Sequence, residues 1–130
     1  MAWGLALLVA SPGPSGAMNA RQDTAPDALR PGMSLAEARR LVVRAGWRPY
    51  PSRRRDVDRC EGQRQLCRAY PETTHCWRDD DARRCVLEFV DTARRRPRLS
   101  DEALRLHFRV GTDGRLIYES YDQTLFGGPG

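Results

Sequence analysis

The sequence predicts an α+β domain in which one main helix packs on a small antiparallel sheet of three to four strands. Apolar residues recur at helical spacing between Ser34 and Ala45, and they alternate with polar residues between Leu104 and Val110. All four cysteines fall between these two patterns, within residues 60–85. We expect this cysteine-rich segment to be a loop-rich insert that is closed by disulfides and joins the helix to the sheet.

Capping signals at both ends predict the helix between Ser34 and Ala45. Ser34 and Glu37 match a capping box, in which the Ser34 hydroxyl accepts a hydrogen bond from the Glu37 amide. Gly46 suits the position just after the helix, and Trp47 would then pack back on the last turn. The apolar stripe between these ends consists of Leu35, Ala38, Leu41, Val42 and Ala45.

The segment from Gly32 to Trp47, with the sequence GMSLAEARRLVVRAGW, resembles the helix of PASTA domains. In that family a glycine and a serine open a helix, which ends in Ala-Gly before a strand. The resemblance implies an extracytoplasmic domain associated with β-lactams or peptidoglycan. The same helix opening also resembles small exported bacterial domains of unknown role.

The start of the 130-residue chain has the composition of an export signal. Residues 1–17 combine a short apolar run with small residues before a cleavage point after Ala17. The run is too short to span a bilayer, which needs about 20 apolar residues. We therefore expect a signal peptide over 1–17, a flexible linker over 18–31, a single domain over 32–126, no membrane span, and a periplasmic or secreted location.

The four cysteines are even in number, lie behind a predicted leader and are separated by six, eight and eight residues. Neither the close cysteine pair of a zinc knuckle nor a Cys-x-x-Cys redox motif occurs. We expect two disulfides, with no metal and no cofactor. The sequential connectivity, Cys60–Cys67 with Cys76–Cys85, is favoured because both loops are short, and the nested connectivity, Cys60–Cys85 with Cys67–Cys76, is the alternative.

The chain beyond the insert predicts strands. Residues 85–91 are rich in β-branched and aromatic side chains, and the strand that ends at Val110 is followed by the turn Gly111-Thr-Asp-Gly114. That turn pairs Val110 with Leu116, Phe108 with Tyr118, and His107 with Glu119.

The residues that could act in catalysis or metal binding are better explained by structural roles. Cys76 beside His75 is expected to be oxidised, and His107 is expected to form a surface ion pair. The run Asp79-Asp80-Asp81 lacks the ligand spacing of a calcium loop. We therefore assign no catalytic residue and no metal ligand, and the candidate binding residues are Tyr70, His75 and Trp77, which lie between the disulfide-closed points.

All basic residues are arginine, and the formal net charge is +5. The arginines are scattered and match no nucleic-acid-binding motif, so we expect no nucleic-acid partner. We expect an exported binding or structural module of the cell envelope without catalytic activity, whose partner is an envelope protein or an anionic wall polymer. The alternative is a small secreted enzyme or enzyme inhibitor with its site in residues 60–85.

Overall fold

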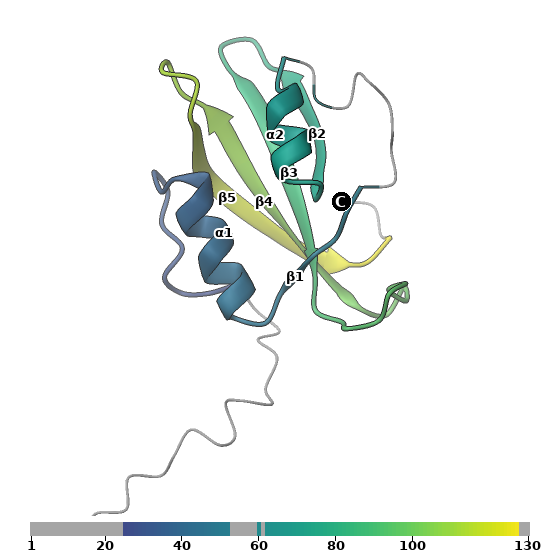
Figure 1. The fold of residues 1–130 in the computed structure, drawn as a ribbon. Coiled ribbons are helices and arrows are strands. Elements are labelled where there is room, and N and C mark those ends of the chain that lie inside the picture. The colour runs from purple at the N-terminus through teal and green to yellow at the C-terminus, as the bar shows by residue number, and fades with distance from the viewer. Residues whose placement is uncertain (1–24, 53–59, 61, 128–130) are drawn as a thin grey trace, which may run out of the picture.

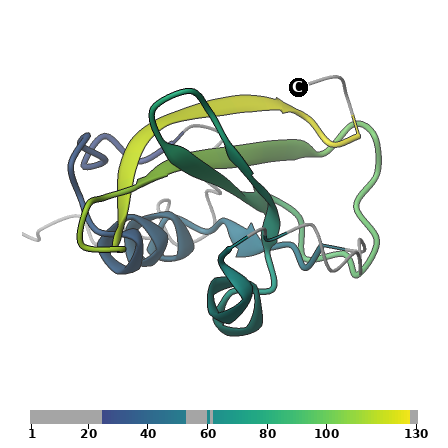
Figure 2. The ribbon, with the colours of Figure 1, turned by 90° about the horizontal axis from the view of Figure 1, so that it is seen from above.

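The computed structural model describes residues 25–52, 60 and 62–127, which form two helices and a five-stranded antiparallel sheet (Figure 1). Along the chain these are α1 (Leu35–Arg44), β1 (Arg48–Pro49), α2 (Arg64–Ala69), β2 (Thr73–Arg78), β3 (Arg83–Val90), β4 (Glu102–Val110) and β5 (Leu116–Leu125). The strand order is β1-β3-β4-β5, and β2 also pairs with β3. Figure 2 shows both helices on the same side of the sheet. The predicted α+β class is confirmed, with five strands in place of three to four.

Helix α1 begins and ends as predicted. The Ser34 hydroxyl accepts a hydrogen bond from the Glu37 amide at 3.2 Å. After the helix, Gly46 has a φ of 103°, which glycine adopts without the steric cost of a Cβ. The Trp47 amide then donates to the Val42 carbonyl at 3.0 Å. This ending turns the chain toward β1 and buries Trp47, whose side chain is 2% exposed.

The segment that precedes α1 belongs to the packed domain. Ala25 and Leu29 are 7% and 8% exposed and lie in the core. A flexible linker was expected over residues 18–31, and the part over 25–31 differs from that expectation because its apolar side chains pack against the core. The predicted signal peptide lies within residues 1–24, outside the described residues.

The sheet face that contacts the helices forms the core. Residues directly opposite each other on paired strands point to the same face, as Leu87 and Leu106 do, and likewise Phe89 and Leu104. These four side chains are fully buried. We call this side of the sheet the helix face. Burial of each such side chain stabilises the fold by about 1.5–3 kcal/mol, so most of the stability comes from this face.

The cysteine-rich insert is closed by disulfides, as the sequence predicted, and it also contains the short helix α2 and the strand β2. Disulfides join Cys60 to Cys67 and Cys76 to Cys85, the sequential connectivity. Strand β2 pairs with β3 so that Cys76 lies opposite Cys85. This pairing satisfies backbone groups that a loop would leave to water.

The hairpin of β4 and β5 follows the prediction near its turn and departs from it beyond. Val110 lies opposite Leu116, and Phe108 lies opposite Tyr118, as expected. The predicted pairing of His107 with Glu119 is wrong, because the register shifts and His107 lies opposite Ser120. The shift is a β-bulge that places one extra residue in β5, a feature that alternation alone cannot reveal.

Candidate functional site

The contacts of the candidate residue Tyr70 are those of a residue that stabilises the fold. It follows α2 and packs against the core, and the Arg39 guanidinium lies 5.2 Å from its ring centroid. Arg39 Nε also lies 2.5 Å from Glu72 Oε1, and the Glu72 side chain is only 2% exposed. A buried carboxylate requires such a cation. The arginine, the carboxylate and the ring therefore tie α1 to the insert.

The other two candidates, His75 and Trp77, lie together on the opposite side of β2. Their rings stack with centroids 4.7 Å apart and an interplanar angle of 27°. Cys76, between them, packs with α2 residues on the helix face, so side-chain alternation directs His75 and Trp77 to the other face. The structure thus brings these two residues together and separates them from Tyr70.

The face of the sheet that points away from the helices, here called the outer face, carries a row of charges. Glu88 Oε2 lies 3.1 Å from Arg105 Nε, and Arg105 Nη1 lies 3.8 Å from Asp122 Oδ1. His107 Nε2 lies 2.5 Å from Asp122 Oδ2. These residues come from β3, β4 and β5 and alternate in sign, so each carboxylate of the row faces a guanidinium or an imidazole.

The acidic run between β2 and β3 takes part in similar pairing. Asp79 Oδ2 lies 3.2 Å from Arg84 Nε, and the same arginine also contacts Glu119. In the described part of the chain, no group of three or more histidine, cysteine, aspartate or glutamate side chains could hold a metal ion.

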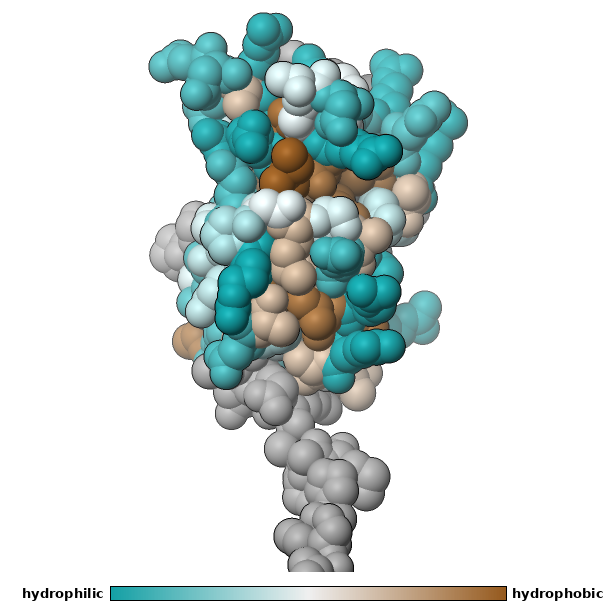
Figure 3. All heavy atoms as spheres, turned by 90° about the vertical axis from the view of Figure 1, so that its left-hand side faces the viewer, coloured by the Kyte–Doolittle hydropathy of each residue, from teal (hydrophilic) through white to brown (hydrophobic). Residues whose placement is uncertain are grey.

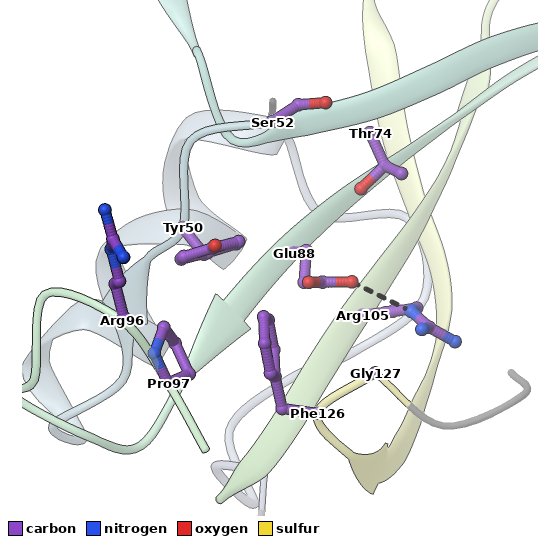
Figure 4. Close-up of a pocket in the computed structure, with 9 residues that line it drawn as sticks. All are labelled: Tyr50, Ser52, Thr74, Glu88, Arg96, Pro97, Arg105, Phe126 and Gly127. Atoms are coloured by element: carbon purple, nitrogen blue, oxygen red, sulfur yellow. Dashed lines mark hydrogen bonds and ion pairs between the residues drawn. The ribbon is translucent and has the colours of Figure 1, made fainter. Parts of the chain in front are cut away.

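A depression of about 510 Å³ opens on the outer face beside the charged row (Figure 4). The residues that line it are Tyr50, Ser52, Thr74, Glu88, Arg96, Pro97, Arg105, Phe126 and Gly127. The rings of Tyr50 and Phe126 meet edge to face, with centroids 5.0 Å apart at 82°. In Figure 4, Phe126 stands between the side formed by Tyr50 and Pro97 and the side formed by Glu88 and Arg105.

Backbone hydrogen bonds fix the two aromatic walls of the depression. The Tyr50 amide donates to the Glu88 carbonyl at 3.0 Å, which continues the sheet past β1. The Phe126 amide donates to the Asp101 carbonyl at 2.7 Å, just beyond the end of β5. Three distant segments of the chain therefore meet here: the one after β1, the one between β3 and β4, and the one after β5.

The candidate binding residues that the sequence predicted did not include Tyr50 or Phe126. Tyr50 lies between two prolines, and Phe126 is followed by two glycines, so neither lies in a segment with a regular apolar pattern. The only available signal was an aromatic residue in a segment of turn-forming residues, where a core role is unusual. Their proximity depends on β1 pairing with the end of β3 and the end of β5 pairing with the start of β4, at the same end of the sheet, which local patterns do not specify.

The side of the molecule that bears α1 differs from the outer face. In Figure 3, hydrophobic residues on that side form a narrow band that is flanked by hydrophilic side chains. Val43 of α1 is 41% exposed. The depression on the outer face instead combines aromatic with charged side chains.

No family model, no curated protein and no solved structure matches this chain. None of the helices within the described residues is long and apolar enough to cross a membrane. Since no comparison assigns a role to the depression, its own geometry is the basis for interpreting it.

Proposed function

We propose that this protein is an exported, non-catalytic module of the cell envelope that binds a partner with the outer face of its sheet. The observation that carries the proposal is the depression flanked by Tyr50 and Phe126. Open cavities that combine aromatic walls with a few fixed polar groups are typical binding sites. Tyrosine and arginine are also among the residues that dominate binding energy at protein interfaces.

The charged groups of the depression suit recognition better than proton transfer. The Glu88 carboxylate is engaged by Arg105 at 3.1 Å, and both side chains are mostly buried, at 15% and 17% exposure. A general base must instead reach a proton on the substrate with its own lone pair. A carboxylate that is already held by a guanidinium is better suited to a rigid wall of a binding site.

Two features support export. The described residues contain two disulfides, and disulfides persist in oxidising compartments outside the cytoplasm. The predicted signal peptide over residues 1–17 agrees with that compartment. The net charge of +5 favours an envelope protein with an acidic surface, or an anionic wall polymer, as the partner.

The test is cosedimentation of the purified, oxidised protein with the envelope fraction of the cell that produces it. We expect saturable binding that Tyr50→Ala weakens at least about tenfold, because a central aromatic contributes about 2 kcal/mol or more. Val43→Ala, an exposed position on α1, is the matched control and should bind like the wild type. A wild-type protein that stays in the supernatant would contradict the proposal.

The stacked His75 and Trp77 support the alternative of an enzyme inhibitor that acts through the insert. The two residues lie on a hairpin that the Cys76–Cys85 disulfide joins, and such a hairpin is a rigid surface for insertion into another protein. Replacement of both rings by alanine separates the two functions. Under the alternative that double variant loses binding, while Tyr50→Ala retains it.

A further inference from the structure

One arginine at the depression differs from the others on the outer face. Arg96 lies in the segment between β3 and β4, lines the depression and is exposed. Arg105 is held by Glu88 and Asp122, and Arg84 is held by Asp79 and Glu119. Within the described residues, Arg96 makes no ion pair or hydrogen bond. Its guanidinium is therefore the available charge at this site.

The charge of the lining selects an anion. Two guanidinium groups, from Arg96 and Arg105, line the depression together with one carboxylate, from Glu88. Because Glu88 and Arg105 are 3.1 Å apart, their charges largely cancel, and one positive charge remains. A single carboxylate on a ligand would neutralise it with a planar, two-pronged hydrogen-bond geometry that guanidinium groups favour.

The remaining walls select an apolar group beside that anion. Pro97 and Tyr50 present carbon surface on the same side as Arg96, and Phe126, which meets Tyr50 edge to face, adds carbon surface between the two sides (Figure 4). On the other side, the half-buried Thr74 offers a hydroxyl that can donate to a carbonyl oxygen. A volume of about 510 Å³ accommodates one or two residues of a peptide.

We propose that the depression binds the C-terminal end of a peptide, with the free carboxylate on Arg96 and an apolar last side chain against Tyr50 and Phe126. This proposal rests on the binding function proposed above and names its ligand. It accounts for the combination of an available cation, an aromatic wall and a hydroxyl within one cavity. An anionic polymer would need the charge but not the aromatic wall.

The test is a calorimetric titration of the full oxidised chain with two tripeptides, Gly-Gly-Phe as the free acid and the same peptide with a C-terminal amide. We expect the free acid to bind at least about tenfold more tightly, the order expected for a charge-assisted hydrogen bond that excludes water. Equal affinity of the two peptides, or no binding of either, would overturn the proposal.

Matched variants locate the contact. Arg96→Gln should weaken binding of the free acid about tenfold and leave the amide unchanged. Arg95→Gln removes the same charge from an exposed neighbour that does not line the depression, and it should leave both affinities unchanged. Phe126→Leu should weaken both peptides. An equal effect of Arg95→Gln and Arg96→Gln would mean that only the general positive charge attracts the peptide, which contradicts the proposal.

The outcomes also separate this inference from the proposed function. If the envelope fraction binds in a Tyr50-dependent manner and neither peptide binds, the ligand is wrong and the binding function stands. If polyphosphate binds and Phe126→Leu leaves that binding unchanged, an anionic polymer replaces the peptide. If neither the envelope fraction nor a peptide binds, both proposals fail.

Discussion

The helix face and the outer face of the sheet are built from the same strands but have opposite chemistry. On β4, Leu106 and Phe108 point toward the helices and are fully buried, whereas Arg105 and His107 point away and remain partly exposed. The helix face excludes water and gains stability from apolar burial. The charged side chains of the outer face stay paired and partly hydrated, so their ion pairs add little stability. A role in binding, rather than in stability, therefore explains the charged residues of the outer face.

The largest expected effect comes from removal of a ring on the helix face. Phe108→Ala should reduce the free energy of unfolding by about 3–5 kcal/mol, since it leaves a cavity in a fully buried site next to Tyr118. His107→Ala, the neighbouring position on the outer face, should cost less than about 1 kcal/mol. Urea denaturation of both variants checks this, and similar losses would end the distinction between the faces.

The next largest effect comes from the disulfide that joins β2 to β3. Replacement of both Cys76 and Cys85 by serine should lower the free energy of unfolding by about 2–3 kcal/mol, because the unfolded chain regains the freedom of the closed loop. Thermal unfolding of the wild type with and without reductant should show at least as large a loss, because reduction also opens the Cys60–Cys67 disulfide. A wild type whose stability is unchanged by reduction would show that the Cys76–Cys85 disulfide does not stabilise the fold.

The Arg39–Glu72 contact predicts an asymmetric response. Arg39→Ala should cost about 2 kcal/mol, since it leaves the Glu72 carboxylate buried at 2% exposure without its cation. Glu72→Gln should cost only about 1 kcal/mol, because Arg39 is 33% exposed and water can solvate it. Denaturant unfolding measures both values, and the reverse order would contradict the structural role given to this pair.

The smallest effect is expected on the outer face itself. Asp122→Asn removes a carboxylate that contacts His107 and Arg105, yet the aspartate side chain is 39% exposed. We expect a loss of less than about 1 kcal/mol, and the difference from the wild type should shrink further at high salt. A loss that persists at high salt would mean that the charged row supports the fold directly.

The sequence predicted the elements whose signals are local. Capping by Ser34 and Gly46 defines α1, and the alternation around Phe108 defines β4, because both depend on neighbouring residues alone. Strand β2 was missed, although Thr73, Thr74 and Trp77 have strand propensity, because the cysteine spacing suggested loops. The bulge in β5 left no local signal.

The candidate site was harder to predict than the fold. Tyr70 was selected because nothing local explained it, and the structure explains it through Arg39, which lies thirty-one positions earlier in the sequence. Tyr50 and Phe126 meet only after β3 and β4 have placed their segments side by side. Such a site depends on contacts between distant parts of the chain, which one sequence does not specify.

The most direct test of the central claim, that the outer face binds the partner, is site-specific photocrosslinking in the producing cell. A benzophenone side chain is placed at Arg95, next to the depression, or at Val43 on α1, and both positions are exposed. We predict a crosslinked product with envelope material from position 95 and none from position 43. A product from position 43 alone would contradict the assignment of binding to the outer face.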